Sequence, residues 1–402
     1  MALKFITDES FKTLAKDKKV LARFDFNVPM DKKNPEMIAD TTRVDEAIAT
    51  IQAILDAGAK KVILMSHFGR PKGKIDMQFS LEPVAKYLAE KLGMEVTLTE
   101  TALDRGIKTL LGLNESKIVL LQNLRFHPEE EANDREFARQ LSTYGEVFVF
   151  DAFGAAHRKH ASTYEINAFF KNKAFGGLLL KRELEALDKI VKDPAKPFIA
   201  VVGGAKVSDK IKIIDALLIS VDKLLIGGAM AYPFLKAKGH VVGKSLCSDE
   251  DVALARRILG TSAKSKIVLP SDHLASMTFG GDVVDVGQTN IDGDLIGLDI
   301  GPSTLVNYQD YLANAKTVLW NGPMGLFENP AYAKGTFGIA KALANLSGKA
   351  FTLVGGGDSV SAVNLTGLGN KMSHISTGGG ASLEYIENGS LPGIQALKFG
   401  ID

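Results

Sequence analysis

Residues 197–210 read Pro-Phe-Ile-Ala-Val-Val-Gly-Gly-Ala-Lys-Val-Ser-Asp-Lys, an apolar run that passes through two glycines into a polar segment. A short unbroken apolar run predicts a strand buried on both faces, as in a parallel sheet. The glycines predict a tight turn, and we expect Ser208 to cap the helix that follows. Strand, turn and helix in this order form the repeating unit of α/β folds.

The same pattern recurs along the chain in two sets. In the first half we expect strands at Val20–Phe26, Lys61–Ser66, Val96–Thr99, Ile118–Leu121 and Val147–Phe150. In the second half we expect them at Phe198–Val202, Lys223–Ile226, Lys266–Leu269, Thr317–Trp320 and Phe351–Val354. A helix over Thr41–Ala57 would place Val44, Ile48, Ile51 and Leu55 on one face.

A helical stretch near Lys181–Lys192 separates the two sets. The sequence therefore predicts an α/β protein of two doubly wound, Rossmann-like parallel-sheet domains joined by a helical hinge. We expect a first domain over residues 1–175, a linker helix over 176–196, and a second domain over 197–385.

Charge and cysteine content narrow the class of protein. Forty-eight Lys and Arg against 47 Asp and Glu leave a formal charge of +1, so we expect neither nucleic acid nor a membrane surface as partner. The chain has one cysteine, Cys247, with no paired His or Asn pattern near it, and its first residues resemble no signal peptide. We expect a cytoplasmic protein without a membrane span.

Arginines follow the predicted strands of the first half. Asp25, Asn27, Arg43, His67, Arg70, Arg125 and Arg158 each stand near a strand end or at a helix start. Ligands of doubly wound sheets bind at the carboxyl ends of strands, and guanidinium groups bind carboxylates and phosphates by forked hydrogen bonds. Any single arginine could simply be a solvated surface residue, but together they predict a site for a small, multiply charged anion such as a phosphorylated carboxylic acid. His157 and His160 lack a third ligand nearby, which argues against a metal there.

Glycines follow the predicted strands of the second half. Gly203–Lys210 combines a glycine turn with Lys206 and Lys210, which suits a phosphate at a helix start. Gly355–Ser359 runs into Asp358, which could hold Mg2+ on nucleotide phosphates or could cap a helix. Ser376–Ser382 would offer backbone N–H groups to a phosphoryl group. Trp320–Pro323 could equally be an ordinary turn, and neither a Walker A motif nor a dinucleotide fingerprint is present.

Several motifs in order make the chain similar to the phosphoglycerate kinase family. They lie at Arg23–Pro29, His67–Pro71, Asn123–Phe126, Asp151–Gly154 with Ala156–Arg158, Gly203–Lys210, Trp320–Gly325, Gly355–Ser359 and Ser376–Ser382. The likeness spans nearly the whole chain, and such a series is far more specific than any one motif.

The resemblance implies a reversible transfer of the acyl phosphate of 1,3-bisphosphoglycerate to Mg-ADP, giving 3-phosphoglycerate and ATP. It implies that phosphoglycerate binds to Asp25, Phe26, Asn27, Arg43, His67, Phe68, Gly69, Arg70, Arg125 and Arg158. It implies that the nucleotide contacts Gly204, Ala205, Lys206, Lys210, Gly297, Asn321, Glu328, Gly356, Gly357, Asp358 and Ser359, with Asp358 as the residue for Mg2+. Arg43, Lys206 and the Gly379 amide would stabilise the transition state.

The resemblance also implies a monomer whose domains close around both substrates. Residues 386–402 would pack back on the first domain, and Glu183 with Ser376 and Thr377 would lie near the hinge. A few residues depart from the usual family pattern, namely Gln122, Phe150, Ala155, Ala229 and Ser303. Two rival classes are an NAD-dependent oxidoreductase, which the missing fingerprint disfavours, and a catalytically silent nucleotide-binding protein of the same fold.

Overall fold

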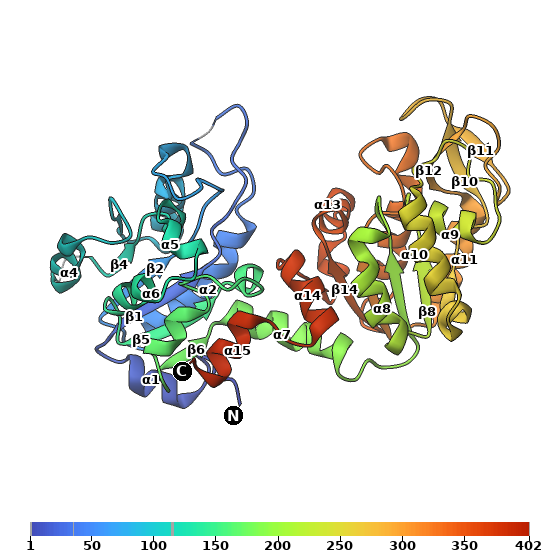
Figure 1. Cartoon of the computed structure of the whole chain (residues 1–402). Coiled ribbons are helices and arrows are strands. Elements are labelled where there is room, and N and C mark those ends of the chain that lie inside the picture. Colours follow the sequence, from blue (N-terminus) through green and yellow to red (C-terminus); the bar gives the residue numbers. More distant parts are fainter. Residues whose placement is uncertain (1, 35, 114–115, 402) are drawn as a thin grey trace. The chain divides into compact units, whose positions relative to one another are not determined.

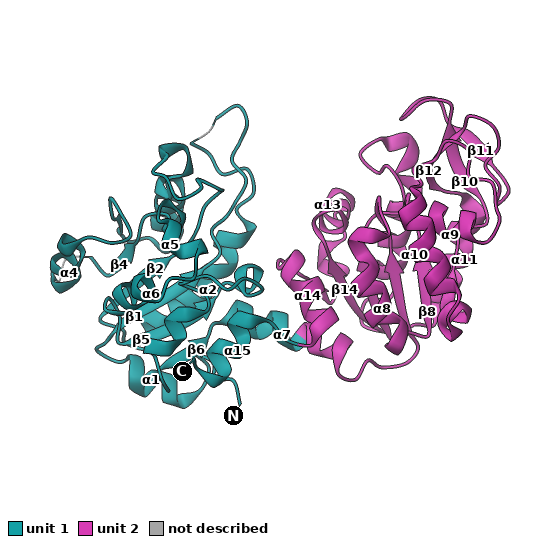
Figure 2. Cartoon of the chain, viewed as in Figure 1, with its two compact units in different colours: residues 1–185, 390–402 teal, residues 186–389 magenta. Residues whose placement is uncertain are grey.

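The computed structural model describes residues 2–34, 36–113 and 116–401. The chain folds into two compact units (Figure 2). Unit 1 comprises Met1–Glu185 together with Ser390–Asp402, and unit 2 comprises Ala186–Gly389. Helix α7, Leu178–Val191, carries the chain from unit 1 into unit 2.

Unit 1, coloured mostly blue to green in Figure 1, is built on a six-stranded parallel sheet. The order of its strands is β3-β4-β2-β1-β5-β6. Its strands are β1 Lys19–Phe24, β2 Lys61–Met65, β3 Val96–Leu98, β4 Ile118–Leu120, β5 Val147–Asp151 and β6 Ala174–Gly176. The first five strands confirm the sequence prediction, with small differences at their ends. The short strand β6 was not predicted, because its three residues include a glycine and show no alternation.

Helices and 3-10 turns complete unit 1. The helices are α1 Glu9–Ala15, α2 Thr42–Asp56, α3 Glu82–Leu92, α4 Arg105–Gly112, α5 Pro128–Glu131, α6 Arg135–Ser142 and α15 Pro392–Phe399. The 3-10 turns are η1 Met77–Phe79, η2 Leu124–Phe126, η3 Phe153–Ala155 and η4 Glu165–Phe169. The helix predicted over Thr41–Ala57 is α2; in it Val44 and Ile51 are buried, whereas Ile48 and Leu55 are only half-buried.

Unit 2 also has a six-stranded parallel sheet, with the order β15-β14-β13-β7-β8-β9. Its strands are β7 Phe198–Val202, β8 Lys223–Ile226, β9 Ile267–Val268, β13 Thr317–Asn321, β14 Phe351–Gly355 and β15 His374–Ile375. A separate antiparallel sheet, β10 His273–Ser276, β11 Val284–Val286 and β12 Ile296–Ile300, was missed by the sequence analysis. Its strands are short, and polar residues and glycines interrupt their pattern.

The helices of unit 2 connect and cover these strands. They are α8 Ile211–Ser220, α9 Ala231–Ala237, α10 Asp249–Leu259, α11 Pro302–Ala313, α12 Lys334–Ala344, α13 Gly357–Thr366 and α14 Gly380–Asn388. The 3-10 turns are η5 Ser208–Lys210, η6 Ser262–Lys266, η7 Pro330–Tyr332 and η8 Gly369–Lys371. The prediction that Ser208 caps a helix is wrong, because Ser208 begins η5 and α8 starts only at Ile211.

Each parallel sheet has a point at which the strand order reverses. In unit 1 the chain leaves β1 toward β2 and later returns to the other side of β1 with β5. In unit 2 it leaves β7 toward β8 and returns beside β7 with β13. Ligands of doubly wound sheets bind at the carboxyl ends of strands next to such a reversal. The fold therefore predicts ligand sites at the loops after β1, β2 and β5, and at those after β7, β13 and β14.

The last helix, α15, completes unit 1 although the whole of unit 2 precedes it in the sequence. The Gly393 N–H donates to the Ala156 carbonyl at 2.9 Å, and Ile394 and Leu397 are buried. None of the helices in the described residues is both long and apolar enough to span a membrane.

Candidate active site

The loops after β1 and β2 and the start of α2 are joined by one chain of hydrogen bonds. Arg43 Nη1 donates to the Asn27 carbonyl at 2.7 Å, and the Gly69 N–H donates to Asn27 Oδ1 at 2.8 Å. The Gly69 carbonyl in turn accepts a 2.8 Å bond from Arg125 Nη1, which follows β4. Asn27, Arg43, Gly69 and Arg125 are thus brought together by their own contacts.

Asp25 lies between two basic side chains. Its Oδ2 is 3.5 Å from Arg43 Nη1, and its Oδ1 is 3.9 Å from His67 Nε2. His67 is buried, and its pKa lies well below the ordinary value because of that burial and of the neighbouring arginines. His67 is therefore neutral at pH 7, and the positive charge of this region belongs to arginine.

The remaining arginines differ in how they are held. Arg125 is buried, and its Nε hydrogen-bonds to nothing among the described residues, although Glu131 Oε1 lies 3.3 Å away. Arg158 is half-buried and donates from Nε to His157 Nε2 at 3.1 Å. Arg70 is exposed. We call the set Asp25, Asn27, Arg43, His67, Arg70, Arg125 and Arg158 the arginine loops.

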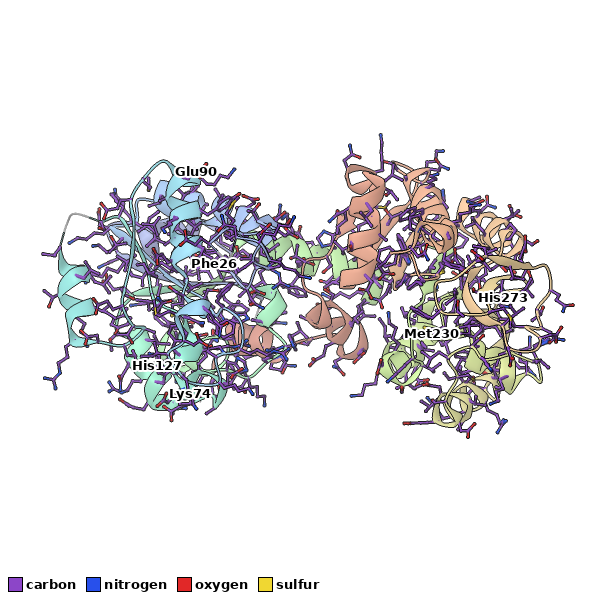
Figure 3. The ribbon with its side chains drawn as sticks, turned by 90° about the horizontal axis from the view of Figure 1, so that it is seen from above. Phe26, Lys74, Glu90, His127, Met230 and His273 are labelled. Atoms are coloured by element: carbon purple, nitrogen blue, oxygen red, sulfur yellow. The ribbon has the colours of Figure 1, made fainter. Side chains whose placement is uncertain are left out.

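Phe26 and Phe68, the two phenylalanines among the predicted site residues, are buried and support the arginine loops. Phe26 is fully buried and is labelled in Figure 3, and its N–H donates to Ser66 Oγ at 2.8 Å. Phe68 is also buried, and it borders a cavity of about 560 Å³ together with Asn27 and Gly69.

In unit 2 the loops after β7 and β13 lie so close together that no side chain fits between them at Gly322. Gly322 has φ of 100°, and a Cβ on it would stand 2.1 Å from the Gly203 carbonyl oxygen. The Gly203 N–H donates to the Asn321 carbonyl at 3.0 Å, and the Gly322 N–H donates to Ser359 Oγ at 2.5 Å. The loop after β8 joins them, since Met230, labelled in Figure 3, donates its N–H to the Gly204 carbonyl at 3.0 Å.

Lys210 is held against the end of β13. Its Nζ donates to the Asn321 carbonyl at 3.2 Å and also to Asn321 Oδ1. Burial lowers the pKa of Lys210 to about 8, and the nearby Asp358 and Asp209 oppose that shift. Asn321 Nδ2 also donates to the Gly355 carbonyl at 2.8 Å, so Asn321 ties the loop after β14 to Lys210.

Lys206 and Asp358 are exposed charged residues of this region. Like Asp209, neither makes a hydrogen bond or ion pair within the part of the chain that the structure describes. Asp358 is the second residue of α13, which begins at Gly357, so the alternative that it is the N-cap is wrong. An unpaired carboxylate fits Mg2+, which prefers one or two carboxylates plus phosphates and water.

The loop before α14 has a conformation that only glycine adopts. Gly379 has φ of 53° and ψ of −116°, and its position would leave room for a Cβ. Ser376 Oγ hydrogen-bonds to Ser382 Oγ and accepts from the Gly378 N–H at 3.2 Å. We call Gly203–Lys210, Asn321–Gly322, Gly355–Ser359 and Ser376–Gly380 the glycine loops.

Two residues expected to contact nucleotide lie elsewhere in unit 2. Gly297 is in β12 of the antiparallel sheet, where its N–H donates to Ser245 Oγ at 2.9 Å. Glu328 is an exposed residue between β13 and η7. No hydrogen bond joins either of them to the glycine loops within the described residues.

Comparison with known proteins decides the family. A family model described as "Phosphoglycerate kinase" matches residues 11–389. The phosphoglycerate kinase of Anaeromyxobacter sp. (strain Fw109-5) is 50% identical over 388 residues, which cover 95% of this chain and 96% of that protein. The corresponding protein of Chlorobium phaeobacteroides (strain BS1) is 48% identical over 391 residues, covering 95% and 97%.

The chain belongs to the phosphoglycerate kinase family.

Solved structures of the phosphoglycerate kinase family share its fold. That of the Coxiella burnetii enzyme is 37% identical with a TM-score of 0.86, and it covers 96% of this chain and 97% of that one. That of the Pyrococcus horikoshii OT3 enzyme is 30% identical with a TM-score of 0.81, covering 96% of each. The chain is accordingly a kinase of two α/β domains, and the silent-protein alternative is not favoured.

The departures from the usual pattern of phosphoglycerate kinases are accommodated locally. Gln122 accepts from the Leu81 and Asn123 N–H groups and donates from Nε2 to Ser80 Oγ at 3.0 Å. Phe150 and Ala155 are buried, and Ala229 packs against a small apolar cluster. The Ser303 N–H donates to Asp272 Oδ2 at 2.8 Å.

Sequence reasoning missed the buried residues behind the arginine loops. Asn123 is fully buried, donates to the Phe68 and Phe79 carbonyls, and accepts from the Phe68 and Arg125 N–H groups. Arg23, Glu130 and Ser162 are also fully buried. A charged residue at an inward position of an apolar strand is the signal that could have revealed Arg23.

Proposed function

We propose that the chain transfers the acyl phosphate of 1,3-bisphosphoglycerate to Mg-ADP, reversibly, with each substrate bound by one set of loops. The observation that carries the proposal is the pair of loop sets, the arginine loops and the glycine loops, each beside the strand reversal of its own sheet. Arginine side chains are frequent in the first set, and glycines with two lysines are frequent in the second.

Phosphoglycerate would bind to the arginine loops. Arg70 and Arg158 are only partly engaged by the protein, and Arg43 is about one-third exposed, so their guanidinium groups can reach a ligand. Forked hydrogen bonds from arginine suit a carboxylate at one end of the ligand and a phosphate at the other. Phe26, Phe68 and Gly69 would support these loops.

The nucleotide would bind to the glycine loops. Gly204, Ala205, Gly356 and Gly357 would allow the backbone to approach the phosphates, and Lys206 and Lys210 would supply positive charge. Asn321 and Ser359 order the loops, and Gly297 and Glu328 would contact the nucleoside. Asp358 would hold Mg2+, which neutralises phosphate charge during transfer.

The reaction needs no covalent intermediate on the protein. A β-phosphate oxygen of ADP attacks the acyl phosphate in line, and the protein's task is to position the two substrates and to balance charge. Arg43, Lys206 and the Gly379 N–H would stabilise the equatorial oxygens of the transferring group. The acceptor in the reverse direction is a carboxyl group.

Transfer requires the two ligands to meet, so we propose a domain closure with the hinge in or near residues 176–196. Closure would also exclude water, which otherwise hydrolyses an acyl phosphate. We further propose a monomer that works in the cytoplasm, since a single cysteine suits a reducing compartment.

A coupled assay tests the proposal. Purified protein with 3-phosphoglycerate and Mg-ATP should consume NADH when glyceraldehyde-3-phosphate dehydrogenase is added, and removal of Mg2+ should stop the reaction. Arg43→Ala should abolish turnover while the unfolding transition stays unchanged. Near-normal turnover of this variant would refute the role of Arg43, and no turnover of the unaltered protein would refute the function.

A further inference from the structure

Behind the arginine loops, the fully buried Arg23 lies in β1. Its register partners are Met65 in β2 and Phe150 in β5, so apolar residues flank it on the same face of the sheet. A guanidinium remains charged in such a place only if its surroundings bind its N–H groups and balance its charge. The contacts of Arg23 therefore show how its charge is stabilised.

One side of Arg23 is bound through a serine to a buried carboxylate. Arg23 Nε donates to Ser162 Oγ at 2.8 Å, and Ser162 Oγ donates to Glu130 Oε1 at 2.6 Å. The Ser162 N–H donates to Glu130 Oε2 at 3.0 Å. The hydroxyl has one proton, which it gives to Glu130, so the direction of the whole chain is fixed.

The other side of Arg23 reaches His67. Arg23 Nη1 donates to the Phe24 carbonyl, and Nη2 lies 3.1 Å from His67 Nδ1. A guanidinium has donors and no acceptor, so Nδ1 must offer its lone pair. A neutral imidazole that accepts at Nδ1 holds its proton on Nε2.

The charges around His67 keep it neutral. Arg23, Arg43, Arg125 and Arg158 disfavour a positive imidazolium, and burial acts in the same direction. Asp25 is the one carboxylate within 4 Å of a ring nitrogen of His67 among the described residues, at 3.9 Å from Nε2. The proton on Nε2 thus points to the side of the ring where Asp25 and the arginine loops lie.

We propose that Arg23 is a positioning residue that fixes His67 as the neutral tautomer with its proton on Nε2, ready to donate to an anionic ligand. Glu130 and Ser162 hold Arg23 in the orientation that this requires. The identity of the ligand as phosphoglycerate rests on the proposed function, but the tautomer does not. His67 then contributes a hydrogen bond without a charge, and this contribution is constant through neutral pH.

Nitrogen NMR of the ligand-free full chain tests the tautomer directly. With 15N-labelled histidine, and with His67→Gln to assign the resonance, Nδ1 of His67 should give a pyridine-type signal and Nε2 a pyrrole-type signal at pH 7 and pH 8. A proton on Nδ1, or an imidazolium at pH 7, would overturn the proposal. This readout does not depend on catalysis, so it separates the inference from the proposed function.

Arg23→Met tests the cause. Without the guanidinium, His67 should populate both tautomers and its pKa should rise. KM for 3-phosphoglycerate at pH 8 should increase by about tenfold, the effect of losing one hydrogen bond to a charged group. That KM should then fall as the pH is lowered and His67 becomes cationic, whereas the unaltered protein should show no such titration, and kcat should change less than KM.

Two further variants guard against a loss of folding. Ser162→Ala removes the acceptor of Arg23 Nε with little change in volume, and it should also mix the tautomers. Lys61→Met is the matched control, because Lys61 is a buried cation of the neighbouring strand whose Nζ donates to the Leu113 carbonyl at 2.9 Å. It should leave the His67 signals and KM unchanged. Control-like behaviour of both Arg23→Met and Ser162→Ala would refute the role of Arg23.

Discussion

The arginine loops and the glycine loops are two different ways to prepare a site for an anion. In the arginine loops, side chains would carry the proposed recognition, and hydrogen bonds such as that from Arg125 to the Gly69 carbonyl hold them in place. In the glycine loops the backbone itself would approach the proposed ligand. The two lysines differ, since Lys210 is hydrogen-bonded to Asn321 and Lys206 has no hydrogen bond or ion pair among the described residues.

The difference between the two sets of loops predicts which substitutions should impair each of them. A side-chain site is damaged by removing a charged group and by disturbing the buried residues that hold it. A backbone site is damaged by changing φ and ψ, and by removing the few charges that it contains. The predictions below follow from this contrast, from the largest expected effect to the smallest.

Lys206→Ala should give the largest effect. Lys206 is the unpaired cation of the glycine loops, and loss of one group that stabilises transition-state charge lowers kcat by roughly 10²–10³-fold. The coupled assay measures it, with thermal unfolding as a check of the fold. Lys212→Ala, an exposed lysine of α8, is the matched control and should remain near normal. If Lys206→Ala and Lys212→Ala lose the same fraction of activity, catalysis depends on the positive charge of this region in general and not on Lys206 in particular.

Variants of Arg125 and Arg70 should distinguish an arginine that also stabilises the arginine loops from one that only binds the ligand. Both Ala variants should weaken 3-phosphoglycerate binding by about 10- to 100-fold, since each removes a charged hydrogen-bond donor. Only Arg125→Ala should also lower the free energy of unfolding, by about 1–3 kcal/mol, because it removes a buried partner of the Gly69 carbonyl. Calorimetric binding and urea unfolding measure the two quantities. Equal stability of the two variants would contradict the contrast.

Gly379→Ala should slow catalysis without removing any charge. The backbone at Gly379 has φ of 53° and ψ of −116°, which a residue with a Cβ avoids, so the loop must change shape. We expect kcat to fall about tenfold, corresponding to about 1.4 kcal/mol of transition-state stabilisation. Gly380→Ala is the control, because Gly380 begins α14 without a positive φ and has open space around its Cβ position. Similar kcat values for both variants would show that the Gly379 conformation is not needed.

Lys210 should give a smaller, pH-dependent effect. Its pKa is about 8 in the folded protein against 10.5 ordinarily, so protonation of this buried amine disfavours the fold below pH 8. Between these two values the unfolded chain binds more protons, and Lys210 therefore adds stability as the pH rises through that window. A bound nucleotide should raise the pKa of Lys210, so ADP affinity should fall severalfold between pH 7 and pH 9.5. Lys210→Met should bind ADP more weakly and lose this part of the pH dependence, and an unchanged pH profile would refute the assignment.

Most of the parallel framework could be predicted from the sequence. Runs such as Phe198–Val202 are apolar throughout because both faces of their sheets are covered, and glycine or a polar residue marks their ends. The antiparallel strands β10–β12 could not be predicted, because their pairing depends on contacts far apart in the sequence, such as Leu274 with Asp299. The ends of helices were also uncertain, as the turn η5 before α8 shows.

The candidate site was only partly predictable. Exposed or half-exposed residues such as Arg43 and Lys206 can be recognised in the sequence, because they are charged and stand beside a predicted strand end or glycine turn. The buried groups that hold them do not, because Asn123 and Ser162 are residue types that occur anywhere in a sequence. Their importance comes from burial and from simultaneous hydrogen bonds, which only the tertiary structure reveals.

The position of α15 has a consequence for biosynthesis. Because residues 390–402 belong to unit 1, a ribosome releases the last piece of the first domain only after all of unit 2 has been made. Until then the nascent first domain lacks the cover that Ile394 and Leu397 provide and the bond from Gly393 to Ala156. Unit 2 is continuous in the sequence and can fold during translation, so the first domain to be synthesised is the last to be completed.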